Sequence, residues 1–243
     1  MRALSAVELL NVWDRGWSRP PYQQAQALLE AGCPDLSPQD IASLSIGQRD
    51  RRLLALRELT FGPRLAAVAV CPKCGIQLDI AFNTTDIEDD GWNDASGANE
   101  QHSVETDGYS VRFHLPTGAD LAALEGAQTG EREMLQRCIV SAQRDGRPVE
   151  PAELPDHVVA AIAQCMAEAD PQADVQLALT CPACAHAWQA PFDIVAFFWS
   201  EVDAWAKRTL REVHALASAY GWREADILAL SPRRRQLYLD LVG

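Results

Sequence analysis

The sequence predicts an α+β protein that is mostly helical and carries a few β-hairpins. Apolar residues recur every three or four positions over most of the chain, which is typical of the buried face of a helix. Two short segments alternate apolar and polar residues around the motifs CPKC and CPAC, and a third alternates around an Asp-Gly pair. Alternation with a period of two indicates strands, so hairpins are expected at these three places.

Residues 1–61 are expected to form several short helices. Two serine-x-x-acid or amide sequences have the spacing of capping boxes, and prolines or glycines stand where helices can begin or end. The expected boundaries are Ser5, Gly16, Pro20, Pro21, Gly32, Ser37 and Ser45. The helix that begins after Ser45 is predicted to run to about residue 61.

Each cysteine pair is expected at the tip of a β-hairpin, the first within residues 62–88 and the second within 173–192. Short runs of strand-forming residues flank both pairs, and a tight turn at the motif would join them. The two hairpins resemble an internal repeat, because Phe82 follows Cys71 and Phe192 follows Cys181 by the same eleven residues. The two pairs are nonetheless separated by 106 residues.

Residues 89–172 form an insertion between the hairpins. The acidic, turn-rich residues 83–101 predict a mobile loop, and an alternating segment with a turn at Asp107-Gly108 predicts one further hairpin. Residues 130–144 and 155–168 have the apolar spacing of amphipathic helices, joined by a turn at Asp145-Gly146. Most of the insertion is therefore expected to be ordered.

Residues 193–243 are predicted to be a long helix followed by short ones. Asp193 can cap a helix that runs to residue 220 and ends at Gly221. A short helix follows, and Ser231 with Pro232 can begin the last one. Trp199 lies off the main apolar stripe and is a candidate for a docking ridge. Together with the preceding segments, this region is expected to complete one compact domain.

The charge and hydropathy of the chain argue against two classes of partner. A formal net charge of −13 and a pI near 4.7 disfavour binding to a phosphate backbone, so no nucleic acid is expected. No run reaches the roughly 18 apolar residues of a membrane span, and the N-terminus lacks a signal-peptide core. The expected location is cytoplasmic, without a membrane partner.

The cysteine pattern points to a metal site. The chain has seven cysteines, and in a reducing compartment paired Cys-x-x-Cys motifs indicate metal or redox chemistry. Two hairpin tips with two thiolates each can close a tetrahedral site, so Cys71, Cys74, Cys181 and Cys184 are predicted to bind one structural Zn²⁺. The fold prediction thus includes a zinc-ribbon-like unit. The remaining cysteines, Cys33, Cys138 and Cys165, stand apart from the pairs. Cys138 and Cys165 lie among apolar helical residues and are expected to be small buried apolar side chains.

Other interpretations of the same residues remain open. The cysteine pairs could be redox-active or simple dithiols without metal, although strands flank them and a thioredoxin-type pair requires a helix N-terminus. His186 could replace a cysteine as ligand. A zinc-ribbon adaptor for nucleic acid or transcription is the alternative function, using the arginines between 49 and 57 or between 233 and 235.

Nothing in the sequence has the pattern of a catalytic site. No phosphate-binding glycine loop, zinc-protease motif or nucleophile elbow is present, so no catalytic residue is predicted and an enzyme is not expected. Tryptophan is abundant for an acidic domain, and aromatic residues are favoured where proteins dock. A binding or assembly role follows.

These segments together resemble a known family. The helix LSIGQRDRRLLALRE, the two Cys-Pro-x-Cys hairpins, the hairpin DGYSVRFHLPTGADL and the tail from residue 192 are similar to the baseplate hub assembly proteins of T-even-type contractile-tailed phages, in the form found in phage-tail-like contractile injection systems. The resemblance implies a chaperone that binds baseplate, hub or spike proteins of a contractile tail. It implies no catalytic residues and maps only the four paired cysteines. Ala185 departs from the pattern, because relatives often have glycine there.

Overall fold

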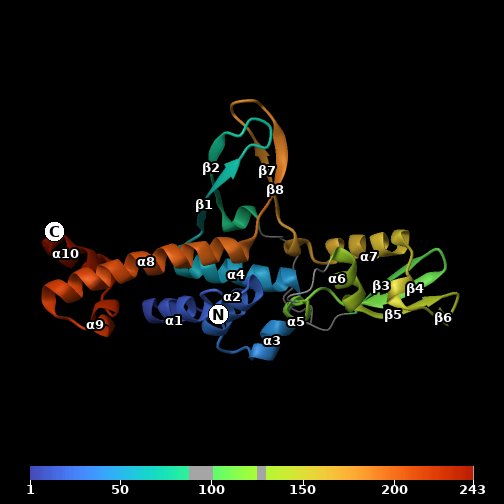
Figure 1. Cartoon of the computed structure of the whole chain (residues 1–243), viewed down its shortest axis with the longest axis horizontal. Coiled ribbons are helices and arrows are strands. Elements are labelled where there is room, and N and C mark those ends of the chain that lie inside the picture. The colour runs from blue at the N-terminus through green and yellow to red at the C-terminus, as the bar shows by residue number, and fades with distance from the viewer. Residues whose placement is uncertain (88–100, 125–129, 243) are drawn as a thin grey trace.

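The computed structural model has an elongated helical body from which a pair of β-hairpins projects (Figure 1). It describes residues 1–87, 101–124 and 130–242. The two projecting hairpins come from distant parts of the sequence and stand side by side. A smaller lobe of strands and helices lies at one end of the body, and the C-terminal helices lie at the other. The predicted α+β class with sequence-distant hairpins is confirmed.

Four helices form the N-terminal part of the body, with boundaries close to those predicted. Ser5, Ser37 and Ser45 each close a capping box, in which the serine hydroxyl accepts the backbone N–H of the residue three positions later. These helices are α1 (Ala6–Gly16), α2 (Pro21–Gly32), α3 (Pro38–Ser43) and α4 (Ile46–Phe61).

The C-terminal part is dominated by the predicted long helix α8 (Ile194–Tyr220). The Asp193 carboxylate caps its first turn by accepting the N–H of Ala196, and Gly221 ends it in the left-handed conformation at a φ of 67°. At about 1.5 Å per residue, α8 spans roughly 40 Å. It is followed by α9 (Glu224–Leu228) and α10 (Pro232–Val242).

Packing of α4 against α8 forms the centre of the main core. Leu53, Leu54 and Leu56 of α4 are almost completely buried, as are Phe198 and Val202 of α8. The apolar stripe of α4 is therefore directed at α8, as the helical spacing predicted. Helices α1 and α2 complete the same core.

A buried ion pair also joins these two helices. The Arg57 guanidinium on α4 donates two hydrogen bonds to the Glu201 carboxylate on α8, at 2.8 and 2.7 Å, and a third to the carbonyl of Gly62. The Arg57 side chain is only 3% exposed, so its charge depends on Glu201 for compensation. The pair fixes the position of α8 relative to the C-terminal end of α4.

The insertion folds into a lobe around its own small core, with a four-stranded antiparallel sheet in the order β3-β4-β5-β6. The predicted hairpin is present as β3 and β4, and its turn residues Asp107 and Gly108 have φ values of 49° and 78°. Two helices cover the sheet. The elements are β3 (His102–Thr106), β4 (Tyr109–Phe113), α5 (Gly118–Ala123), α6 (Glu131–Cys138), β5 (Ile139–Arg144), β6 (Arg147–Pro148) and α7 (Asp156–Ala169).

The prediction of one helix over 130–144 is wrong in its second half. Helix α6 ends at Cys138, and the next residues form β5, which pairs with β4. The Asp145-Gly146 turn connects two strands, with φ values of 47° and 76°, and not two helices. The β-branched residues Ile139 and Val140 favour a strand once β4 offers an open edge.

The predicted acidic loop falls largely outside the described residues, which exclude 88–100. Its first residues form a short 3₁₀ turn, η1 (Thr84–Asp86), and two further 3₁₀ turns are η2 (Pro151–Glu153) and η3 (Pro171–Ala173). None of the helices in the described part of the chain combines the length and apolar composition that a bilayer span requires.

Replacing Arg57 by methionine should destabilise the protein by about 2–4 kcal/mol, because the substitution leaves Glu201 without its cation and removes three hydrogen bonds from a buried position. Denaturant unfolding followed by circular dichroism measures the change. The control is Arg2→Met, which removes an ion pair with Glu8 that is exposed to solvent and should therefore cost much less than Arg57→Met. Equal losses for the two variants would show that the α4–α8 pair has no special structural role.

Candidate metal centre

The packing of α4 against α8 also places the two cysteine hairpins. Helix α4 leads directly into β1 (Arg64–Val70), which pairs with β2 (Gln77–Asn83). In the second hairpin β7 (Gln176–Thr180) pairs with β8 (Ala187–Pro191), which leads directly into α8. Because both hairpins leave from neighbouring helix ends, they must stand next to each other despite their separation in sequence.

Both hairpins end in the same tight turn. In the first, Gly75 donates its backbone N–H to the Cys71 carbonyl at 2.9 Å, and the Cys71 N–H bonds the Ile76 carbonyl at 3.0 Å. In the second, Ala185 and Cys181 form the equivalent bonds, each at 2.9 Å. Each turn directs its two thiols away from its own strands and toward the opposite hairpin.

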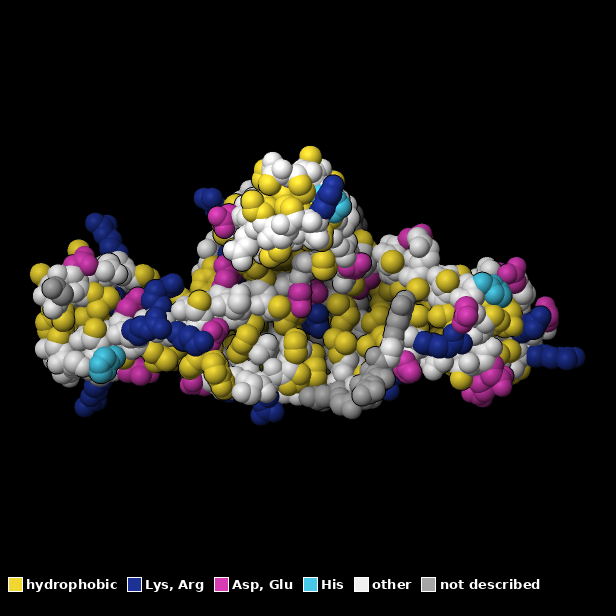
Figure 2. All heavy atoms as spheres, turned by 45° about the horizontal axis from the view of Figure 1, so that its top comes forward, with side chains coloured by type: hydrophobic (Ala, Val, Ile, Leu, Met, Phe, Trp, Pro, Cys, Tyr) yellow, Lys and Arg dark blue, Asp and Glu magenta, His cyan; other side chains and the backbone are white. Residues whose placement is uncertain are grey.

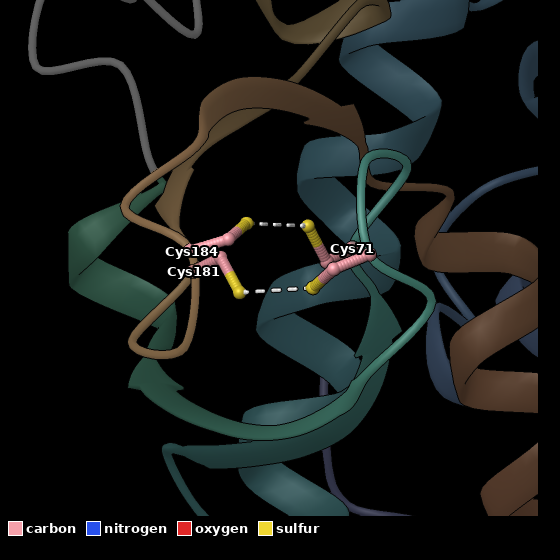
Figure 3. Close-up of side chains that lie close together, drawn as sticks. Cys71, Cys181 and Cys184 are labelled. Atoms are coloured by element: carbon pink, nitrogen blue, oxygen red, sulfur yellow. Dashed lines mark hydrogen bonds between the residues drawn. The ribbon is translucent and has the colours of Figure 1, made fainter.

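The four predicted cysteines meet between the hairpin tips (Figure 3). The Cys71 and Cys184 sulfurs are 3.7 Å apart, the Cys74 and Cys181 sulfurs are 3.6 Å apart, and all four lie within 4.8 Å of one another. Four sulfurs at about 2.3 Å from one tetrahedral ion would be separated by roughly 3.8 Å. The donor set and its spacing therefore fit a metal ion of the size and preference of Zn²⁺.

The pKa values of the thiols show how their surroundings affect the formation of thiolates, the form that binds a metal cation. Burial alone would raise the pKa of Cys71, but the backbone N–H groups of Cys74 and Lys73 outweigh it and hold that pKa at about 7. The N–H of His186 acts to lower the pKa of Cys184, but burial and the neighbouring sulfurs raise it to about 12. The Cys71 thiol can thus ionise readily, while the raised pKa of Cys184 opposes a second negative charge beside it. A divalent cation at the centre would remove that resistance.

The geometry does not match a redox pair. The cysteines of each pair lie in a strand-to-strand turn, whereas a thioredoxin-type pair uses a helix N-terminus to stabilise its thiolate. The shortest contacts, moreover, join sulfurs of different hairpins, Cys71 with Cys184 and Cys74 with Cys181. His186 is not among the four grouped ligands, because its ring stacks on Trp188 with a 7° angle between the planes.

The internal repeat predicted from the spacing has a structural counterpart. Phe82 and Phe192, each eleven residues after the first cysteine of its motif, pack edge to face with ring centroids 5.5 Å apart. A shift of 110 positions relates the first hairpin to the second, so Cys71 corresponds to Cys181 and Ile76 to His186. The aromatic pair closes the base of the unit and the cysteines close its tip.

A second group of possible ligands was not foreseen from the sequence. Ligand atoms of His114, Asp120 and Cys138 lie within 4.8 Å of one another in the insertion lobe. Asp120, however, caps α5 by accepting the N–H of Thr117, and Arg137 stands 3.5 Å from its carboxylate. Burial raises the pKa of Cys138 to about 12. The group is therefore explained by helix capping and a buried thiol.

The structure also shows the surroundings of two of the other cysteines and of Trp199, the candidate docking residue. Cys33 is buried in the main core, and Cys165, expected to be buried, is half-buried against the core of the insertion lobe. Trp199 is not a free ridge, because a Cβ on Gly16 would lie 2.2 Å from its ring. Its off-stripe position is explained by close packing of α8 against α1, where only glycine leaves room for the indole.

The arginines considered for nucleic-acid binding are partly used inside the protein. Arg57 is buried against Glu201, Arg49 pairs with Asp50 at 2.7 Å, and Arg235 is buried against Glu212. A buried, paired guanidinium cannot reach a phosphate without breaking its ion pair. These three arginines therefore do not contribute to the basic faces that the sequence suggested for phosphate binding.

Comparison with known families gives one match. A family model described as T4 bacteriophage base plate protein matches residues 9–199, which is more than three quarters of the chain and includes both cysteine hairpins. The chain belongs to this family. Membership indicates a structural or assembly role in a baseplate and contact with other baseplate components. Searches of curated proteins and of solved structures give no significant match.

The two hairpin turns allow a reciprocal test of backbone strain. Gly75 and Ala185 both have positive φ, 74° and 54°, and no atom lies within 4 Å of where a Cβ on Gly75 would stand. Gly75→Ala should therefore cost about 1 kcal/mol through its backbone conformation alone, while Ala185→Gly should leave stability unchanged or raise it by up to about 1 kcal/mol.

Thermal unfolding of the two variants and the parent protein checks this prediction. Loss of stability in both variants would mean that the Ala185 methyl group makes a favourable contact that outweighs its strain. No change in Gly75→Ala would mean that the first turn relaxes away from the left-handed region.

Proposed function

We propose that this protein is a non-enzymatic assembly factor, or chaperone, for the baseplate or spike hub of a phage-tail-like contractile injection system. The observation that carries the proposal is the family match, which extends across the helical body and both cysteine hairpins. The resemblance of the sequence to hub assembly proteins supports the finer role. Its clients would be hub or spike proteins of the same tail.

The second part of the proposal is that Cys71, Cys74, Cys181 and Cys184 bind one structural Zn²⁺. Four sulfur ligands complete a tetrahedral shell and leave no position for water or substrate, which is the arrangement of structural and not catalytic zinc sites. Cys71 and Cys181 are each 1% exposed, whereas Cys184 is half-buried and Cys74 is exposed, so the site would lie at the surface of the hairpin tips. When bound, the ion would cross-link the two hairpins.

The surface of the hairpins supports a docking role. Val68 and Val70 on β1 are 62% and 55% exposed, and Ile76 at the turn is 42% exposed. Figure 2 shows hydrophobic side chains gathered on the projecting tip, beyond the helical body. A cluster of exposed apolar residues is expected where one protein contacts another. The metal would keep this small projecting surface rigid without a large core beneath it.

Loss of one ligand should release the ion and destabilise the protein. The purified parent protein should contain about one zinc per chain, whereas Cys71→Ser should contain almost none and lose several kcal/mol of stability, because the affinity of a structural metal is part of the folding free energy. Metal analysis and unfolding curves measure both effects. Acid should also release the ion, since protons compete for the thiolates as the pH falls.

Cys165→Ser is the matched control, because Cys165 lies in α7, outside the group of four, and this variant should keep its metal. A chelator should lower the melting temperature of the parent protein and of the control but not that of Cys71→Ser. An unchanged melting temperature of the parent protein after complete metal removal would refute the structural role.

The assembly role is tested in the producing cell. Deletion of the gene should abolish complete contractile particles in electron micrographs, while the parent gene and the Cys165→Ser variant restore them. Co-purification of a tagged protein with hub or spike components would identify the client. Intact particles in the deletion strain would contradict the proposal, whatever the metal content of the protein.

A further inference from the structure

A cleft of about 830 Å³ separates the two hairpins on one side. It is formed by one strand of each hairpin, β2 and β7, together with the turn before β7. Apolar side chains in its lining come from both strands, and the volume is within the range of about 300–1,000 Å³ seen for ligand sites. The cleft is lined by residues 79–82, 86–87, 171–172 and 174–179.

The backbone edge of β2 that faces away from β1 has no partner strand among the described residues. In an antiparallel pair, alternate residues direct both backbone groups toward the partner strand, and the residues between them direct theirs outward. The bond from the Cys71 N–H to the Ile76 carbonyl sets this alternation in the first hairpin. The backbone groups of Asp79 and Ala81 therefore point outward, and both residues line the cleft.

The same reasoning applies to β7. The bond from the Cys181 N–H to the His186 carbonyl makes the odd-numbered residues of β7 pair with β8. Gln176 and Ala178 consequently direct their backbone groups away from β8, and both line the cleft. In the described structure, two open strand edges thus border one cleft without pairing with each other.

The cleft is acidic. Asp79, Asp86 and Asp174 are exposed residues of its lining, and none of them forms an ion pair within the described part of the chain. Figure 2 shows acidic side chains where the hairpins meet the helical body. Asp86 accepts the Asn83 N–H at 2.7 Å and Asp174 accepts a side-chain N–H of Gln176 at 2.6 Å, but both donors are neutral. Three carboxylates without a cation beside them, next to open strand edges, favour a ligand that brings positive charge.

The internal repeat provides a comparison within the same molecule. The shift of 110 positions places Gln189 at the site equivalent to Asp79, and Arg64 at the site equivalent to Asp174. The other side of the unit, bordered by β1 and β8, therefore lacks the acidic residues although its strands are repeat-related. The negative charge belongs to the β2–β7 side specifically and does not follow from the hairpin fold.

We propose that the β2–β7 cleft binds an extended, basic segment of a partner protein, which adds a strand to one or both open edges. Main-chain hydrogen bonds would provide affinity, and lysine or arginine side chains alternating with apolar ones would meet the carboxylates and the apolar lining. The five residues of β7 offer an edge of roughly 17 Å at about 3.3 Å per residue. The identity of the partner as a tail component rests on the proposed assembly function.

The first test uses the full-length protein and a blocked hexapeptide of alternating lysine and valine as the probe. In ¹⁵N–¹H NMR spectra, the peptide should shift the amide signals of Asp79, Ala81, Gln176 and Ala178. A glutamate–valine peptide and a backbone N-methylated lysine–valine peptide should cause no such shifts. Shifts that are absent, that spread over the whole surface or that persist with the N-methylated peptide would overturn the proposal.

The second test uses a pair of alanine-to-proline variants. Ala178→Pro removes an outward N–H at the cleft, and Ala66→Pro removes an outward N–H on β1, on the other side of the unit, so both leave the bonds within their hairpins in place. Ala178→Pro should weaken peptide binding roughly two- to tenfold, as expected for one lost hydrogen bond, while Ala66→Pro should have no effect. Equal effects of the two variants would contradict the proposal.

A third variant does not depend on the strands tolerating proline. The double substitution Asp79→Asn and Asp174→Asn keeps the shape of both side chains and should weaken peptide binding roughly two- to tenfold at low salt. The difference in affinity between the parent protein and the double variant should shrink as the salt concentration rises, because salt screens the attraction between the peptide and the carboxylates of the parent protein. Unchanged affinity at low salt would show that the carboxylates do not recognise the ligand.

Co-purification separates this proposal from the proposed function. If the tagged parent protein captures a tail component and Ala178→Pro captures as much as Ala66→Pro does, the cleft is not its binding site, although the assembly role stands. If the parent protein captures no tail component, the assembly role fails. The peptide titration then still decides whether the cleft binds extended basic segments.

Discussion

The contact between α4 and α8 is the constraint on which the rest of the structure depends. Each helix continues into one strand of a different cysteine hairpin, so the position of one helix on the other determines whether four sulfurs can meet. Closing a chain of about a hundred residues costs roughly 2 kcal/mol more than closing one of ten, by loop-closure entropy. Burial of leucine and phenylalanine side chains between the helices, together with the Arg57–Glu201 pair, can offset that cost before any metal binds.

The insertion is compatible with this arrangement because its two ends lie next to each other, where the Gln172 side chain donates to the carbonyl of Ile87 at 3.2 Å. The first hairpin begins just after the C-terminal end of α4, and the return segment is fixed at the N-terminal end, where the Gly47 N–H bonds the Asp170 carboxylate at 2.9 Å. A Cβ at position 47 would lie 1.9 Å from that carboxylate, so glycine is required for the contact. The lobe can therefore fold around its own core without moving the hairpins.

The parts of the fold that sequence alone predicted are those determined by neighbouring residues. The capping boxes at Ser5 and Ser45, the start of α3 after Ser37, the end of α8 at Gly221 and the Asp107-Gly108 turn depend on local hydrogen bonds and backbone conformation. The grouping of the cysteines was also predictable, because four identical ligands at two repeated motifs leave few other arrangements.

The parts that sequence missed depend on distant partners. The sequence predicts a helix through the residues of strand β5, because these six residues show no clear period of their own and acquire a strand conformation only through pairing with β4. The roles of Arg57 and Trp199 required the packing of α8, which brings Glu201 and Gly16 within reach. Charged and bulky side chains of this kind look like surface residues until their long-range partners are known.

The long helix also connects the family-matched region to the tail beyond it. The match ends at residue 199, whereas α8 continues to Tyr220, so the boundary falls inside one continuous helix. Residues beyond the match are buried with Leu10 of α1, and Arg235 of α10 binds Glu212 of α8 at 2.6 Å. The tail therefore belongs to the same packed body as the metal centre.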